Sequence, residues 1–329
     1  MNYSNCQSHV EYVIINEERR VYFIIIIAYC FTLGSGGIAM YYFLSLLCGI
    51  LVAVTVAQNG GLADKYGVHT SSVIIHLTGL LVIGIIMLIK RERPFNKRQV
   101  WYLYLGGAIG VLTVACNNLA FGRISVSAIL AIILLGQSVM GLAFDQYGWL
   151  GMQKHPFNKR RIIGLLLTIG GIVVMTDRFD YIAVSLSFLA GIIIVISRSL
   201  NARLAELTSI RVSTFFNYTI GLIVSIVVLI IFGRNEPLKT DIVISSDFYI
   251  YFGGTFGVCL VLISNIVVTK IPAFYLTLLS FVGQVFTGII IDTLIDRSFS
   301  ILIMIGGMLV AAGLCVDIII SRNIAKEAT

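Results

Sequence analysis

Ten apolar stretches run through the chain, separated by short polar segments. A helix that crosses a lipid bilayer needs about 20 apolar residues, so each stretch is a candidate span. Only 12% of the 329 residues are charged, against roughly 25% in soluble domains, which argues against a water-soluble enzyme. We therefore expect an all-α polytopic membrane protein. The stretches are residues 40–62, 69–89, 100–121, 124–144, 161–176, 181–204, 212–233, 248–269, 272–293 and 299–320.

The positive charges between the stretches favour one orientation in the membrane. If the first stretch begins in the cytoplasm, the inner side holds 15 lysines and arginines and the outer side holds 6. Cytoplasmic loops are enriched in these residues, so we predict that both termini are cytoplasmic. Because these loops account for much of the net charge of +7, we expect a lipid bilayer around the chain and no nucleic-acid partner.

The chain contains two copies of one unit. A shift of 142 residues places Gly49, Asn59 and Gly79 on Gly191, Asn201 and Gly221. A shift of 147 places Asn118, Gly136-Gln137 and Asp145 on Asn265, Gly283-Gln284 and Asp292. Polar matches inside apolar stretches do not follow from composition. We assign residues 40–177 to the first five-helix repeat and 178–329 to the second, which ends in a short cytoplasmic tail.

An odd number of spans in each unit reverses the orientation of the second copy. Inverted repeats are a recurring architecture of secondary transporters, in which the two copies form two gates around a central site. The sequence thus predicts ten transmembrane helices as two inverted repeats and transport by alternating access. The rival hypothesis is a non-transport membrane protein, either a scaffold or a lipid-modifying enzyme.

Several short motifs resemble one transporter family. They are Gly136-Gln137, the run from Asp145 to Gly151, Gly164, Asn59-Gly60-Gly61-Leu62 and Asn201-Ala202-Arg203-Leu204. In these the chain resembles the YdcZ-type inner-membrane exporters, a branch of the drug/metabolite transporter superfamily. The resemblance implies an EamA-like exporter of small metabolites or drug-like compounds in a bacterial inner membrane. It also implies that the first four spans of each unit line the path.

The second copy departs from the family pattern after Asp292. There Thr293-Leu294-Ile295-Asp296 replaces the aromatic and glycine run of the first copy. Members of the family are commonly single five-span units, so the chain looks like a fused pair. The resemblance says little about cargo, and a monomer or a homodimer would both fit it.

Residues 1–39 lie outside the repeat. They hold an acidic and basic run, 17–20, and an apolar run of about 12 residues, 21–32, which is short for a span. A signal peptide is one alternative. We favour a functional start at Met40, where the repeat begins. The codons for Gly36-Gly37 can form a ribosome-binding sequence just before it. Intact-mass measurement of the native protein would test this.

Polar residues deep in the stretches are the candidate substrate-binding residues, because each costs free energy in lipid and usually faces a cavity or a partner. Gln137 and Gln284 fall near the midplane, on opposite sides of it, and an amide suits uncharged or zwitterionic cargo. The alternative for each is a bond between helices, or capping near a helix end. The remaining candidates are His76, Tyr218, Asn118, Asn265, Asn59, Asn201 and Arg198.

Three charged residues give two further hypotheses. Arg198 could attract an anionic group, or its side chain could extend to the lipid interface. Asp145 and Asp292 could exchange protons for coupling, or they could be exposed turn carboxylates. Six cysteines without paired spacing and four scattered histidines predict no disulfide framework, metal site or cofactor. No catalytic motif occurs, so we expect no enzyme activity.

Overall fold

The computed structural model describes residues 38–94, 99–147, 161–175, 180–233, 247–268, 270–271, 273–296 and 300–327. Within these ranges the chain forms ten α-helices, α2 to α11, and two short 3₁₀ helices, η1 and η4. The first half comprises α2 (Ile38–Tyr66), α3 (Val68–Ile89), η1 (Trp101–Leu105), α4 (Gly106–Ala120), α5 (Val126–Tyr147) and α6 (Arg161–Met175).

The second half repeats this order. It comprises α7 (Tyr181–Leu207), α8 (Ile210–Phe232), η4 (Phe248–Phe252), α9 (Gly253–Val268), α10 (Ala273–Asp296) and α11 (Ile301–Glu327). Each apolar stretch of the sequence thus coincides with a helix. Side chains cap several helix starts. For example, Asp180 accepts from the backbone N–H groups of Ile182 and Ala183, and Ser209 accepts from that of Val212, which satisfies donors that lack helical partners.

Six of the described helices are long and apolar enough to cross a membrane, and four further apolar helices are shorter. The six are α2, α3, η1 with α4, α5, α7 and α8. The four are α6, η4 with α9, α10 and α11. An all-α membrane protein is therefore confirmed, whereas the count of ten spans rests on the sequence.

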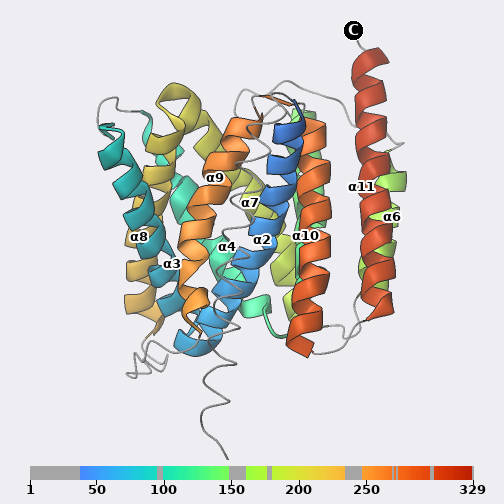
Figure 1. The fold of residues 1–329 in the computed structure, drawn as a ribbon, viewed down its shortest axis with the longest axis horizontal. Helices are drawn as coiled ribbons and strands as arrows, with labels where there is room; N and C mark the ends of the chain where they lie inside the picture. Colours follow the sequence, from blue (N-terminus) through green and yellow to red (C-terminus); the bar gives the residue numbers. More distant parts are fainter. Residues whose placement is uncertain are drawn as a thin grey trace, which may run out of the picture.

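The helices lie side by side with α6 and α11 at one edge of the bundle (Figure 1). These two pack closely through glycines. A methyl group at Gly171 would come within 2.6 Å of the Gly306 carbonyl, and one at Gly313 within 2.7 Å of the Gly164 carbonyl. The later residue of α6 contacts the earlier residue of α11, so the two helices are antiparallel.

The main hydrophobic core surrounds the first half of α5. Its residues from 128 to 133 are at most 2% exposed, and they join one cluster with Ala53 and Val56 of α2 and Phe281 of α10. A helix that is apolar on all faces is expected to be buried on all of them. The beginning of α5 is thus enclosed by helices from both halves of the chain.

Candidate functional site

Close helix crossings place the two glutamines. α2 packs against α10 at Gly49, where a methyl group would come within 2.9 Å of the Gln284 backbone nitrogen. α7 packs against α5 at Gly191, where a methyl group would come within 2.9 Å of the Gln137 backbone nitrogen. Small residues of this kind let helix backbones approach. Each glutamine is therefore held at a crossing between the first and second halves.

The side chains of the two glutamines differ in environment. Gln284 is 6% exposed, and its Oε1 atom has no hydrogen-bond partner in the described part of the chain. Gln137 is half-buried. A buried carbonyl oxygen without a partner costs free energy, so Gln284 is equipped to accept a hydrogen bond from a bound molecule.

His76 of α3 and Tyr218 of α8 meet in the interface between those helices. They are 4% and 6% exposed, and their ring centroids are 6.0 Å apart. A methyl group at Gly221 would overlap the His76 ring, and one at Gly79 would overlap the Tyr218 ring. The His76 ring thus packs on Gly221 of α8, and the Tyr218 ring packs on Gly79 of α3. Both residues contribute to helix packing in this conformation.

Hydrogen bonds fix the same interface. His76 Nδ1 lies 2.8 Å from the Ser72 carbonyl and 3.2 Å from Ser225 Oγ, and the two serine hydroxyls are 2.9 Å apart. Tyr218 donates its hydroxyl proton to the Gly254 carbonyl over 3.3 Å. The serines were not singled out from the sequence. Their signal was available, because both are polar positions inside apolar stretches.

Asn59 lies where α2 meets α9, and Asn201 lies where α7 meets α4. A methyl group at Gly253 would overlap the Asn59 amide, and one at Gly106 would overlap the Asn201 amide. Asn201 Nδ2 also donates to Asn217 Oδ1 over 2.8 Å. Asn118 Nδ2 donates to Ser71 Oγ over 2.9 Å.

Four acceptor oxygens near the ends of α2 and α4 lack partners among the described residues, those of Gln58, Asn59, Asn117 and Asn118. Gln58, which was not selected from the sequence, donates from Nε2 to the Tyr249 carbonyl over 2.9 Å. The neighbouring candidate Asn59 was the sequence signal that could have indicated Gln58. The side chain of Asn265 lies outside the described residues.

Asp292 is buried and caps α5. It is 5% exposed and accepts from the backbone N–H groups of Val126 at 2.7 Å and Ser127 at 2.9 Å, as well as from the Ser127 hydroxyl. A carboxylate is favourable at a helix N-terminus. The alternative of an exposed turn carboxylate is therefore wrong for Asp292. The side chain of Asp145 lies outside the described residues.

Arg198 contrasts with these buried residues. Its side chain is exposed although it belongs to the middle part of α7. Of the candidate residues with described side chains, it is the only one that carries a positive charge. Within the described part of the chain it forms no ion pair.

The family model described as "Putative inner membrane exporter, YdcZ" matches the chain twice, over residues 40–174 and 182–316. Together the matches cover well over half of the chain. The chain belongs to this family. The two matches also confirm that a YdcZ-type chain can carry two units in tandem, and they place it in an inner membrane.

Solved structures share the fold of this YdcZ-type chain. One crystal structure, titled only as that of a protein, superposes with a TM-score of 0.56 at 16% identity and covers 86% of this chain and 97% of its own. At this identity the likeness concerns the fold alone. No curated protein sequence matches the chain.

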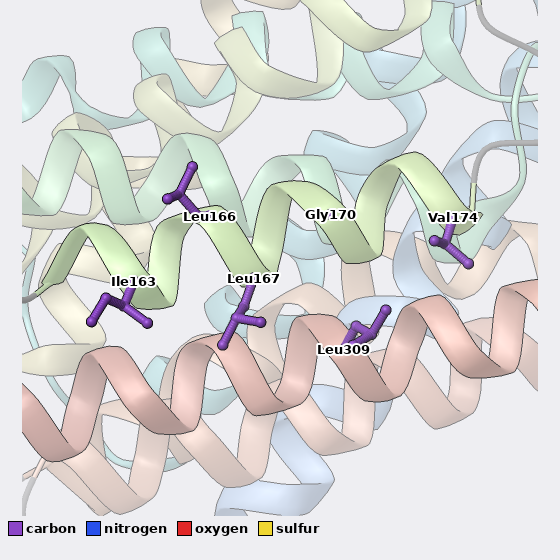
Figure 2. Close-up of a pocket in the computed structure, with 6 residues that line it drawn as sticks. All are labelled: Ile163, Leu166, Leu167, Gly170, Val174 and Leu309. Carbon is purple, nitrogen blue, oxygen red and sulfur yellow. The ribbon is translucent and has the colours of Figure 1, made fainter.

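A shallow groove of about 430 Å³ lies between α6 and α11 of the YdcZ-type chain. Figure 2 shows Leu167 of α6 and Leu309 of α11 extending into the space between the helices. All six lining residues are apolar: Ile163, Leu166, Leu167, Gly170, Val174 and Leu309. Such a lining offers no hydrogen bond, so we assign the groove to the lipid-facing surface and not to the path of a polar cargo.

Proposed function

We propose that the protein is a secondary active transporter that exports small metabolites or drug-like compounds by alternating access. In this proposal all ten helices cross the membrane, the two five-helix units are inverted, and both termini are cytoplasmic. The observation that carries the proposal is the exchange of equivalent contacts between the halves. Gly49 contacts α10 as its equivalent Gly191 contacts α5.

Contacts between α3 and α8 support the inversion. His76 fits over Gly221, and Tyr218 fits over Gly79, so each step forward on α3 is a step back on α8. A two-fold axis in the membrane plane would exchange these two contacts. The packing of α6 against α11 obeys the same relation. Helices related in this way must enter the membrane from opposite sides.

Two sets of equivalent asparagine contacts would form the two gates. Asn59 contacts Gly253 near the end of α2, and Asn201 contacts Gly106 toward the end of α7. If the units are inverted, these contacts lie at opposite faces of the membrane. Opening one while the other stays closed would expose a central site to one side at a time.

The central site in this proposal is formed around Gln137 and Gln284, with His76, Tyr218, Asn118 and Asn265 in its walls. The unpartnered Oε1 atom of Gln284 supports a ligand that donates a hydrogen bond. Amides both donate and accept, which suits uncharged or zwitterionic cargo. His76 and Tyr218 would reach the site only if α3 and α8 separate, since both are buried against each other here.

Flux measurements in proteoliposomes test transport directly. We expect the purified protein to move some members of a broad metabolite panel across the bilayer, driven by an ion gradient. A scaffold or lipid-modifying enzyme would move none of them. Failure across the panel together with turnover of a lipid substrate would replace the transporter hypothesis with the enzyme.

Gln137→Leu tests the site. We expect loss of transport with nearly unchanged folded yield and melting temperature, because Leu retains the volume and removes the amide. Gln58→Leu is the matched control, since it also removes a helical amide but leaves the Tyr249 carbonyl without its donor. It should lower the melting temperature instead. Loss of folding in Gln137→Leu with normal specific activity would assign this glutamine to the scaffold.

A further inference from the structure

Arg198 lies deep in its helix. α7 has 27 residues, and Arg198 is four residues beyond the central residue, Ile194. At 1.5 Å per residue the backbone of Arg198 is about 6 Å from the middle of the helix. If α7 spans the membrane, this depth is inside the hydrocarbon core, where a charge is costly and usually functional.

The Arg198 side chain lies on a face of α7 that is turned away from lipid. Gly191 lies seven residues earlier, about two turns, and therefore on the same face of the helix. That face contacts α5. Leu189 lies nine residues earlier, about two and a half turns, and so on the opposite face; it is 45% exposed. Arg198 is thus exposed on the face that is turned toward the bundle.

The charge of Arg198 has no counter-charge in the described part of the chain. None of the salt bridges there includes it; they are Arg123–Asp180, Arg203–Glu206 and Arg211–Glu92. It does interact electrostatically with the Cys48 thiol of α2, and Cys48 is 2% exposed. The guanidinium therefore lies near Cys48 of α2, and its own side chain is exposed.

We propose that Arg198 forms the carboxylate-binding part of the transport path, so that the cargo is a small solute with a carboxylate group. This inference rests on the proposed transporter function and narrows its substrate class. The planar guanidinium can hold a carboxylate through two parallel hydrogen bonds. Because no carboxylate of the described residues pairs with it, its hydrogen-bond donors are available to solute. The equivalent residue in the first repeat is Val56, so the carboxylate contact exists on one side of the centre only.

A reporter cysteine tests whether solute anions reach Arg198. Ala202 is exposed and one turn beyond Arg198 on nearly the same face. In a cysteine-free background, Ala202→Cys is labelled with an anionic and with a cationic methanethiosulfonate reagent of similar size, in neutral phosphatidylcholine vesicles. We expect Arg198→Gln to lower the ratio of anionic to cationic labelling rates about tenfold, and Arg198→Lys to retain most of it.

Competition with matched probes tests the carboxylate. Benzoate should slow labelling by both reagents, whereas benzamide, which has the same ring without the charge, should not. The protection should disappear in Arg198→Gln. Melting curves of the variants establish that each is folded before the rates are compared.

Four results would overturn the proposal. A cysteine at 202 that reacts with neither reagent would place it away from solvent. An unchanged labelling ratio in Arg198→Gln, or equal protection by benzamide, would remove the carboxylate contact. A ratio that changes only in vesicles with anionic lipid would assign Arg198 to headgroups. Labelling needs no turnover, so each result is independent of the flux assay.

Discussion

The two repeats pack equivalent residues differently at opposite ends of the bundle. In the first half of α5, Ile129, Ile132 and Ile133 are at most 2% exposed. The equivalent residues of α10 are half-buried; they are Leu276, Leu279 and Ser280. One sequence unit therefore occurs in a closed arrangement in one copy and in a looser one in the other.

The helices that begin each repeat show the same difference. Ala53 and Val56 of α2 are 0% and 7% exposed, whereas Val195 of α7 is half-buried and Arg198 is exposed. If both termini are cytoplasmic, as proposed, the closed end would be the outer one and the structure would represent an inward-facing state. Alternating access predicts a second state in which the two ends exchange their packing.

The largest expected effect comes from exchanging the residues that differ most. Val56→Arg buries a charge beside Ala53 and the first half of α5, at a cost of about 2.5–3.5 kcal/mol, so little folded protein should survive extraction. Arg198→Val should leave the melting temperature unchanged or raise it, because the charge it removes has no ion-pair partner among the described residues. Melting curves of the two variants side by side measure the difference.

Equal destabilisation by these two substitutions would contradict the comparison. It would mean that both ends are packed alike and that Arg198 is as enclosed as Val56 when the protein is in a membrane. Val56→Leu, which changes volume without charge, separates the cost of the charge from the cost of added size.

Substitutions at the glycine crossings are expected to have the next largest effect. Gly49→Ala places a methyl group against the Ser280 carbonyl, and Gly191→Ala places one against the Ile133 carbonyl. In both, backbone must move, so we expect about 1–3 kcal/mol of destabilisation. Because the two contacts are equivalent, the two losses should be similar in thermal unfolding.

Gly84→Ala is the control for the crossings. A methyl group there would meet nothing within 4 Å, and alanine favours a helix over glycine, so this variant should be neutral or slightly more stable. A loss at Gly84 as large as at Gly49 would show that the glycines matter for backbone flexibility and not for close packing.

Asp292→Ala removes the cap of α5 from the closed end. The N–H groups of Val126 and Ser127 then lose their acceptor, which we expect to cost about 1–2 kcal/mol in equilibrium unfolding. Asp64→Ala, at an exposed carboxylate near the end of α2, should cost little and serves as the control.

Asp292→Asn separates capping from proton coupling. The amide oxygen keeps one acceptor for α5, so most of the stability should return. If Asp292 also exchanges protons, the folded Asn variant should lose transport driven by a pH gradient while retaining exchange of cargo. Full transport by Asp292→Asn would leave the carboxylate as a cap only.

Much of the fold follows from the sequence because membrane solvation acts on long local patterns. Each apolar stretch became a helix, and the glycines matched in the repeat proved to lie at helix crossings. The ends were less predictable. α2 continues to Tyr66 and α11 to Glu327, past the expected ends at 62 and 320, since polar residues can extend a helix beyond the hydrocarbon.

The site was less predictable because its contacts join distant parts of the chain. Nothing near Asp292 in the sequence reveals that its partners are 165 and 166 residues away. Likewise, the sequence identified His76 and Tyr218 as candidate polar residues but did not reveal that each packs on a glycine of the other's helix. Such complementarity depends on which helices meet, and composition does not determine that.

A polar contact at the looser end involves Glu92, which follows α3. It accepts hydrogen bonds from Ser209 and Arg211 at the start of α8. Partial burial opposes ionisation of Glu92, but the hydrogen bonds from Ser209 and Arg211 and the charge of Arg211 outweigh it and lower the pKa of the carboxyl below its usual value. The ionised carboxylate therefore favours the folded state.

Glu92→Gln should have the smallest effect, at most about 1 kcal/mol, because Arg211 is 43% exposed and solvent screens the pair. A lowered pKa contributes stability above the unfolded value of about 4.5, and this contribution is lost as the pH falls through the folded pKa. The melting temperatures of wild type and variant should thus differ at neutral pH and converge in acid. Glu206→Gln, whose carboxylate is 65% exposed beside Arg203, should show no such dependence. A Glu92 difference that persists in acid would mean that the contact acts through shape and not through charge, and that the looser end of the bundle is not held by it electrostatically.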